Sequence, residues 1–302
     1  MAMNDLSLQA MPGLRVGHWT NPVARTGCTV LAFDDPALSA AEVRGAAPGT
    51  REIECLAPGR LEQNVNAIVL TGGSAFGLAT AAGVAEQLAM GGTGVPFGAS
   101  VVPVVPAAVI YDLANGDPIA PTASDGRAAL LAAIPLDQTK QGAVGAGTGA
   151  TWNKLAGTRQ AGGLGIAQAA CGEYLVTAFV VLNAMGVVRG LGDDPRPAVL
   201  GSGSVSPRAG EATSLIAVVT DHPADHGTLT RLCVAAHDGL ARMVIPAHTL
   251  YDGDVAFATT LVEGTIDAKA RLRLALATEL AVEAAVLRAA LPDRSGSATL
   301  GT

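Results

Sequence analysis

The sequence predicts an α+β fold in which helices cover layers of strands. Short apolar runs rich in β-branched residues, typical of strands, outnumber the helical stretches, and the last third carries two long helical stretches. Strands and helices do not alternate strictly, which favours a layered sandwich over a doubly wound sheet. No internal repeat or clear linker divides the chain, so residues 1–302 are expected to form a single domain.

The composition is that of a globular protein with a small-residue core. Hydrophobic residues make up 49% of the chain and charged residues 15%, while aromatic residues reach only 3%. With 37 glycines, the core is expected to consist of Ala, Val and Leu with close backbone approaches. The net charge of −7 argues against a nucleic-acid partner, because phosphate binding needs a basic surface.

Cysteine spacing and the apolar segments bear on cofactors and location. The four cysteines are far apart and form no CxxC pair, so neither a metal site nor a disulfide framework is expected, and no cofactor is implied. The N-terminus lacks the charged and apolar regions of a signal peptide. The longest apolar stretches are too short to span a bilayer, which predicts a soluble, cytoplasmic protein without a membrane partner.

The first half of the chain is expected to form strands interrupted by two helices. The predicted strands are 14–18, 27–33, 67–70, 101–105 and 108–111. Asp34-Asp35-Pro36 is expected to close the second of these strands. Helices are predicted at about 78–90 and at 123–134, the latter capped by Ser124 or Asp125.

The second half is expected to contain strands followed by long helices. Two paired strands are predicted around 162–165 and 174–188, followed by strands beginning at 213 and covering 257–261. The stretch from about 228 to 244 keeps its apolar residues at helical spacing. A closing helix is predicted over 268–291, with Asp267 as its N-cap.

Thr213 lies where a loop rich in Gly, Ser and Pro, 201–210, enters an apolar strand. A cut immediately before Thr213 would place a free α-amine beside the hydroxyl of the same residue. An amine with a pKa of roughly 7.7–8.0 can act as the general base for that hydroxyl at neutral pH. Taken alone, these residues fit an ordinary core strand better. Whether Thr213 is a nucleophile therefore depends on motifs elsewhere in the chain.

The glycine-rich run 142–151 has three interpretations. It lacks the Gly-Lys-Ser/Thr ending of a phosphate-binding loop and a βαβ context, so a nucleotide site is the weakest of them. Close packing of backbone on backbone is the plain structural interpretation. In the third, exposed amides bind an oxyanion or a substrate carbonyl, which makes Gly147 and Thr148 candidate substrate-binding residues.

A serine hydrolase is a weaker alternative. The stretch 71–77 resembles a nucleophile elbow around Ser74, but Phe76 stands where the final glycine of G-x-S-x-G belongs. None of the five histidines stands out as a partner, and the spacing of His222 and His226 across Pro223 does not predict a zinc site.

Asp252 and Asp254 stand two residues apart, so in an extended segment both side chains point to one side. Two such acids in isolation are most simply solvated loop residues. Beside an α-amine they could hold that amine and tune its pKa.

Taken together, six ordered motifs resemble the self-processing N-terminal-nucleophile hydrolases, a family that includes L-aminopeptidase/D-esterases, β-peptidyl aminopeptidases and nylon-oligomer endo-hydrolases. The resemblance covers nearly the whole chain, from residue 14 to about 257, and it favours Thr213 as a nucleophile. The motifs are residues 43–51, 70–78, 145–151, 181–186, 236–242 and 252–254.

The resemblance implies a four-layer αββα sandwich and a chain that cuts itself between Ala212 and Thr213, giving an α chain 1–212 and a β chain 213–302. It implies Thr213 as nucleophile and Asn183 as the oxyanion-stabilising residue. It further implies roles for a catalytic lysine, an acidic pair near the nucleophile and an active-site tyrosine, which correspond to Lys154, Asp252, Asp254 and Tyr111. Ala212 departs from the Asn or Gly often found before the nucleophile, which bears on the cleavage rate.

The resulting expectation is an autoprocessing threonine hydrolase acting on small peptides or amides, including ω-amino-acid oligomers, as aminopeptidase or amidase. The resemblance also implies a homo-oligomer, with a tetramer favoured. Two alternatives remain open: an unprocessed relative that serves as a binding or scaffold protein, and an acyltransferase that passes the acyl group to an amine instead of water.

Overall fold

The computed structural model describes residues 7–202 and 211–291. Its strands are β1 Leu14–Asn21, β2 Thr26–Val43, β3 Thr50–Arg51, β4 Asn64–Thr71, β5 Val95–Phe97, β6 Ser100–Val102, β7 Ala107–Val109, β8 Ile134–Pro135, β9 Thr151–Trp152, β10 Gln160–Ala161, β11 Leu164–Cys171, β12 Tyr174–Asn183, β13 Val187–Val188, β14 Thr213–Thr220, β15 Val244–Ile245 and β16 Val255–Thr260. Its α-helices are α1 Ala79–Met90, α2 Ala123–Leu131, α3 Arg196–Ser202, α4 His226–Met243 and α5 Ala268–Ala290. Short 3₁₀ turns include η2 Ser74–Leu78 and η4 Gly145–Gly147. The predicted loop 201–210 lies mostly outside the described residues.

The principal sheet runs in the order β11-β12-β14-β16-β2-β4-β7-β3, with β1 paired to β2. Neighbours are antiparallel except for β14–β16 and β4–β7, which are parallel. Strand β2 is the long connecting strand of this sheet, because its first half pairs with β1 and β4 and its second half pairs with β16.

The prediction that Asp34-Asp35-Pro36 ends the second strand was wrong. Strand β2 continues to Val43, and its register against β4 shifts between Ala32 and Ala37. All three residues of the acidic Pro segment are exposed at this irregularity. A bulge tolerates proline because the local ladder hydrogen bond is already missing.

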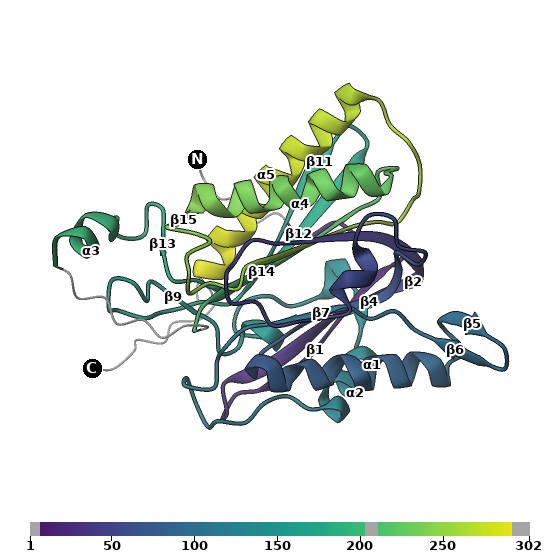
Figure 1. The fold of residues 1–302 in the computed structure, drawn as a ribbon, viewed down its shortest axis with the longest axis horizontal. Coiled ribbons are helices and arrows are strands. Elements are labelled where there is room, and N and C mark those ends of the chain that lie inside the picture. Colours follow the sequence, from purple (N-terminus) through teal and green to yellow (C-terminus); the bar gives the residue numbers. More distant parts are fainter. Residues whose placement is uncertain (1–6, 203–210, 292–302) are drawn as a thin grey trace.

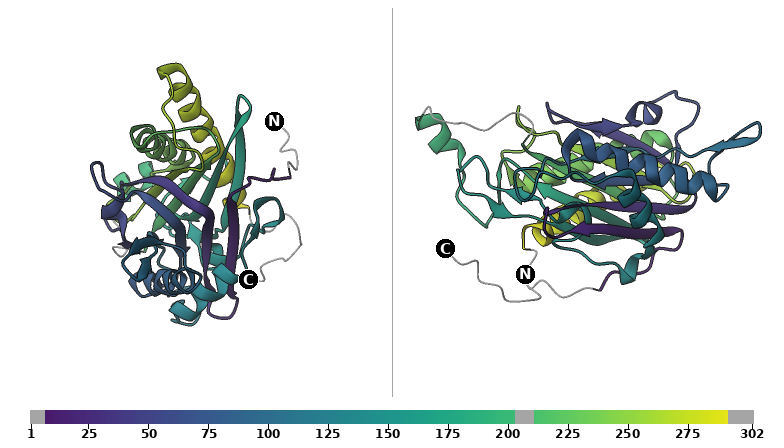
Figure 2. Two further views of the ribbon diagram at one scale, coloured as in Figure 1. Left: turned by 90° about the vertical axis from the view of Figure 1, so that its right-hand side faces the viewer. Right: turned by 90° about the horizontal axis from the view of Figure 1, so that it is seen from below.

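Three hydrophobic cores separate four layers, as expected. One core lies between helices α4 and α5 and the strands β11, β12, β14 and β16. The second lies between those strands and β1, β2 and β4, and the third between β2, β4 and the helices α1 and α2. Figure 1 shows α4 and α5 on one side of the strands and α1 and α2 on the other, and the left view of Figure 2 keeps this order. The arrangement is an αββα sandwich.

Side chains alternate along each strand, so that neighbouring residues pack into different cores. In β12, Phe179 and Val181 point into the middle core, whereas Ala178 and Val180 belong to the core under α4 and α5. Phe179 and Phe257 are the largest fully buried side chains. Burying one such side chain contributes roughly 1.5–3 kcal/mol. The strands are therefore apolar on both faces, which explains their continuous hydrophobic runs in the sequence.

Capping residues fix where the helices begin. The predicted cap of the last helix is confirmed, since Asp267 accepts a hydrogen bond from the Ala270 amide at 2.7 Å. Helix α4 begins earlier than expected, because Asp225 caps it by accepting from the Thr228 amide at 2.7 Å. For α2 the expectation was wrong: Thr122 is the N-cap, and its amide donates to Asp125. Such a cap contributes about 1 kcal/mol.

None of the described helices is both long and apolar enough to cross a bilayer.

The fold brings the start of β14 against the segment that precedes β16. Because β14 and β16 run parallel, the residues before each strand meet at the same edge, and Ala212 forms a parallel bridge with Asp252. On the other side, β14 pairs antiparallel with β12, so its first residue lies opposite the last residue of that strand. This edge carries most of the candidate residues.

Candidate active site

Thr213 is the first residue of β14, opposite Asn183 at the end of β12. Every residue of β14 is buried, and Thr213 itself is 3% exposed in the uncut chain. The β-branched side chain suits a central strand, and the hydroxyl of Thr213 contacts the Ala212 carbonyl oxygen at 2.5 Å. The candidate nucleophile therefore lies directly beside the peptide bond that it is expected to cut.

Gly253 supplies a second contact to the same carbonyl. Its backbone amide donates to the Ala212 oxygen at 3.0 Å. A β-carbon at this position would lie 2.7 Å from the Thr213 hydroxyl oxygen and 2.4 Å from the Ala47 carbonyl oxygen. Only glycine fits without displacing the nucleophile. This donor was not among the predicted site residues.

Lys154 and Asn183 hold the next carbonyl along the chain, that of Glu211. The Lys154 ammonium donates to the Glu211 oxygen at 2.6 Å and to the side-chain and backbone oxygens of Asn183 at 2.7 and 3.2 Å. The Asn183 amide nitrogen lies 3.5 Å from the same Glu211 oxygen and 3.3 Å from the Tyr111 carbonyl oxygen. In the uncut chain, then, Asn183 holds Glu211 and not the carbonyl to be cut.

Burial lowers the pKa of Lys154 to about 7, and the positive charge of Arg159 adds to this effect. Asp252, Glu211 and Asp254 oppose the shift. A lysine with a pKa near neutrality can both hold a carbonyl and exchange a proton in the physiological range.

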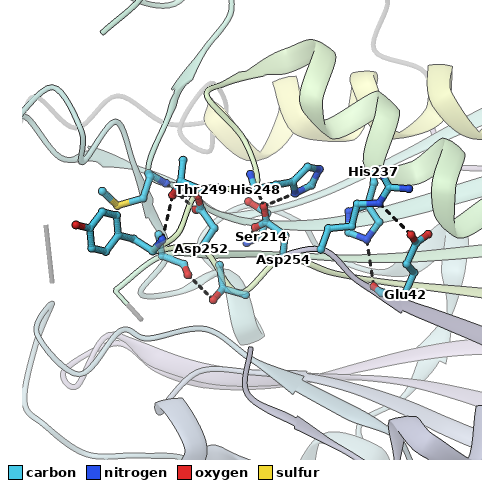
Figure 3. A network of polar contacts seen from close by, with 12 residues as sticks. Glu42, Ser214, His237, His248, Thr249, Asp252 and Asp254 are labelled. Atoms are coloured by element: carbon cyan, nitrogen blue, oxygen red, sulfur yellow. Dashed lines mark hydrogen bonds and ion pairs between the residues drawn. The ribbon is translucent and has the colours of Figure 1, made fainter. Parts of the chain in front are cut away.

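Asp254 orients the strand that carries the nucleophile. Its carboxylate accepts from the Ser214 amide at 2.6 Å and, through the other oxygen, from the amide and Nδ1 of His248 at 3.1 and 2.8 Å (Figure 3). Burial opposes a charge on His248, but the hydrogen bond and the negative charge of Asp254 outweigh it and raise the pKa of His248. His248 was not singled out from the sequence, although it lies in the same short segment, 246–254, as the two acids.

A second histidine stands behind His248. The rings of His237 and His248 meet edge to face, with centroids 4.9 Å apart, and Nε2 of His237 contacts the backbone oxygen of Glu42 at 3.1 Å (Figure 3). Burial lowers the pKa of His237 to about 4, so its ring is neutral at physiological pH. Because a neutral ring carries one N–H, the contact to a carbonyl places that proton on Nε2.

The hydrogen-bond partners of Asp252 differ from the expected one, the α-amine of Thr213. Its carboxylate accepts from the Met185 amide at 3.2 Å and from the amide and hydroxyl of Thr249, whereas the hydroxyl of Thr213 contacts Ala212. The expected contact with the α-amine cannot form in the uncut chain, because that amine is still part of a peptide bond. Burial, and next the charge of Asp254, raise the pKa of Asp252.

The three predicted substrate-binding residues are Tyr111, Gly147 and Thr148. Tyr111 touches the site through its carbonyl oxygen, which Asn183 binds. In the glycine run, the amide of Gly147 donates to Val144, and both the amide and the hydroxyl of Thr148 donate to Gly145. These groups are engaged inside their own turn, which is the close packing that the plain interpretation expects. Their role in substrate binding stays a prediction.

Arg159 and Asp112, which were not predicted as site residues, lie next to residues of the candidate site. The side chain of Arg159 contacts the Glu211 carboxylate at 3.3 Å and the Asn115 side chain at 3.1 Å. Asp112, after Tyr111, is buried and accepts from the Gly73 amide at 2.7 Å. Sequence spacing offers no signal for either residue, since their partners are distant in the chain.

The alternative serine site has no histidine partner in the part of the chain that the structure describes. Ser74 has a left-handed backbone with a φ of 54°, as in a nucleophile elbow. Within residues 7–202 and 211–291, however, no histidine hydrogen-bonds its hydroxyl. In the same part of the chain, no group of three or more His, Cys, Asp or Glu side chains could hold a metal ion.

Comparison with known proteins decides the family. The model of peptidase family S58 matches residues 7–295. The chain belongs to this family. Its members hydrolyse peptide and amide bonds, and the chain is accordingly a hydrolase of that class.

Two relatives illustrate the range of the family. An uncharacterized aminopeptidase of Mycobacterium leprae is 36% identical over 94% of this chain and 86% of its own length. The 6-aminohexanoate-oligomer endohydrolase of a Kocuria species is 32% identical over 83% of this chain and 74% of its own length.

Solved structures share the fold. A β-aminopeptidase from a Burkholderia species superposes with a TM-score of 0.72 and 24% identity, over 92% of this chain and 84% of that one. An L-aminopeptidase D-Ala-esterase/amidase from Ochrobactrum anthropi, described as a variant of the N-terminal-nucleophile hydrolase fold, gives a TM-score of 0.71 and 18% identity over the same shares. The expected fold, an N-terminal-nucleophile-hydrolase-like αββα sandwich, is confirmed.

Proposed function

We propose that this family member is an N-terminal threonine hydrolase that activates itself by cutting the bond between Ala212 and Thr213. The observation that carries the proposal is the position of the Thr213 hydroxyl, 2.5 Å from the Ala212 carbonyl oxygen, while the Gly253 amide donates to that oxygen. A nucleophile and an oxyanion donor thus meet at one peptide bond.

Maturation proceeds as an acyl shift. The Thr213 oxygen bonds to the Ala212 carbonyl carbon, its proton passes to the Thr213 nitrogen, and the carbon–nitrogen bond breaks to leave an ester. The Gly253 amide stabilises the negative charge that develops on the Ala212 oxygen, an effect worth roughly 3–4 kcal/mol per donor in other enzymes. The bond break also frees the α-amine of Thr213, and water then hydrolyses the ester to free the Ala212 carboxylate and the Thr213 hydroxyl.

Lys154 and Asp254 support this step from both sides. Lys154 fixes the Glu211 carbonyl, so the peptide bond after Ala212 is held in one orientation. Asp254 fixes the Ser214 amide and thereby the start of β14. Holding both flanks of the reacting bond favours attack, because orientation is a large part of the barrier.

In the mature enzyme the same hydroxyl attacks a substrate amide, with the α-amine of Thr213 as general base. Once the cut segment leaves, the Lys154 ammonium and the Asn183 amide are free to bind a substrate carbonyl. We expect Asp252, whose backbone forms a bridge with Ala212, to bind the new amine. The substrate is a small peptide or an oligoamide, in keeping with the aminopeptidase and endohydrolase names of the relatives.

Two variants of the nucleophile test this function. Thr213→Ala should remain one intact chain and should release no amine from an aminoacyl anilide. Thr213→Ser keeps a hydroxyl and should still split and still hydrolyse the anilide. A Thr213→Ala variant that splits and hydrolyses at the wild-type rate would overturn the proposal.

A further inference from the structure

Glu211 and Ala212 fill the space beside the nucleophile in the uncut chain. Ala212 is fully buried, and its carbonyl oxygen touches the Thr213 hydroxyl. Under the proposed function the hydroxyl oxygen of Thr213 later attacks the carbonyl of a substrate. Because one nucleophile serves both reactions, the segment before the cut marks the path that the acyl side of a substrate takes.

The backbone of Glu211 is bound as an N-acyl group would be. Its carbonyl oxygen accepts from the Lys154 ammonium at 2.6 Å and faces the Asn183 amide at 3.5 Å. A substrate with a free amine on its acyl residue has no carbonyl at this point. An N-acylated substrate does, and it regains these contacts.

The side chain of Glu211 meets a positioned cation. Its carboxylate lies 3.3 Å from Arg159, and the two side chains are 17% and 43% exposed. Arg159 also donates to Asn115 at 3.1 Å, and Asn115 in turn donates to the Gly149 carbonyl at 2.7 Å. These contacts hold the guanidinium in place independently of Glu211, so it stays aimed at the same point after the cut segment leaves.

The nearby acids are turned toward the protein itself. Both oxygens of Asp254 accept hydrogen bonds from Ser214 and His248. Both oxygens of Asp252 accept from Met185 and Thr249. The charged groups that contact Glu211 are Lys154 and Arg159, and their positive charge attracts a carboxylate and repels an ammonium ion.

We infer that the mature site accepts N-acylated peptide or oligoamide chains in which the residue before the acyl residue carries a carboxylate. Lys154 binds the backbone carbonyl of that residue, and Arg159 binds its carboxylate. The inference rests on the proposed function and names its substrate class. Because the Arg159 pair is partly exposed, the preference for the carboxylate is modest, about fivefold over the matching amide.

Four anilides that share alanine as the acyl residue test this. They are acetyl-Glu-Ala, acetyl-Gln-Ala, acetyl-Lys-Ala and free Ala p-nitroanilide. The kcat/KM of the mature enzyme should be about fivefold higher for the Glu compound than for the Gln compound, lower again for the Lys compound, and lowest for the free amine. Arg159→Gln should bring the Glu-to-Gln ratio close to one.

Arg127→Gln is the matched control, because Arg127 also pairs with a glutamate, Glu86, but on the surface of α1 and α2. It should leave the Glu-to-Gln ratio at the wild-type value. A mature enzyme that hydrolyses the Glu, Gln and Lys compounds equally, or prefers free Ala p-nitroanilide, would overturn the inference and leave the proposed function standing. A chain that never splits would overturn both.

Discussion

The Gly253 amide and the Ala212 carbonyl oxygen lie 3.0 Å apart, and the Thr213 hydroxyl contacts that oxygen from a second direction. The contact exists because β14 and β16 run parallel, which aligns the residues that precede them. Gly253 lies between Asp252 and Asp254, so one short segment provides both the donor to the Ala212 oxygen and the carboxylate of Asp254 that binds the Ser214 amide.

Replacing Gly253 by alanine should block maturation. The added methyl group would lie 2.7 Å from the Thr213 hydroxyl oxygen and would displace either the nucleophile or the amide donor. Loss of one oxyanion donor slows acyl transfer by about 10²–10³ in other enzymes. A time course on denaturing gels should show that the uncut chain of the variant persists about 100-fold longer, or more, than the uncut wild-type chain.

Gly227→Ala is the control for this change, since a β-carbon there comes no closer than 3.6 Å to another atom. It should mature at the wild-type rate. Cleavage of a folded Gly253→Ala variant at the wild-type rate would show that the Gly253 site is not needed for maturation.

The pH dependence of maturation should report on Lys154. Its ammonium donates to three oxygens, and only the protonated form can satisfy all of them. Because burial lowers the pKa of Lys154 to about 7, the ammonium predominates below pH 7 and the neutral amine above it. The cleavage rate should therefore fall as pH rises above 7, by about tenfold per pH unit.

Lys154→Arg keeps the positive charge throughout this range and should mature with a rate that is nearly constant above pH 7. A wild-type rate that instead rises through pH 7 would show that Lys154 acts as a neutral base.

The pair of Asp254 and His248 should stabilise the fold more at low pH than at high pH. Asp254 raises the pKa of His248 against the effects of burial and of Arg44, so the folded protein binds the proton more tightly than the unfolded chain. The resulting stabilisation is fully present below the unfolded pKa of about 6.5 and is lost as pH rises through the folded pKa.

Thermal unfolding of His248→Gln checks this sign. The drop in melting temperature relative to wild type should be larger at pH 6 than at pH 9. In an Asp254→Asn background the same substitution should lose most of its pH dependence. An equal drop at both pH values in the wild-type background would contradict the account.

The sequence predicts the fold class because the signals are local. The apolar spacing of α4 and α5 and the cap at Asp267 depend on neighbours within a few residues. The course of β2 could not be predicted in this way, because Asp34-Asp35-Pro36 has the composition of a turn. Its pairing with the distant strands β4 and β16 keeps the chain extended there.

The candidate site was predictable to the extent that side-chain identity marks it. Thr213 alone fits an ordinary core strand and the two acids alone fit solvated loop residues, so it is the resemblance of the ordered motifs that marks them. The structure brings them together with Lys154 and Asn183. The Gly253 donor does not stand out, because every residue except proline carries the same amide. Arg159 and His248 act through partners whose proximity depends on the tertiary fold.

The intact masses of purified wild-type protein show whether the chain cuts itself before Thr213. We expect two chains, one ending at Ala212 and one running from Thr213 to Thr302, with a single intact chain in the Thr213→Ala variant. A wild-type protein that stays intact after long incubation, or that splits at another bond, would contradict it.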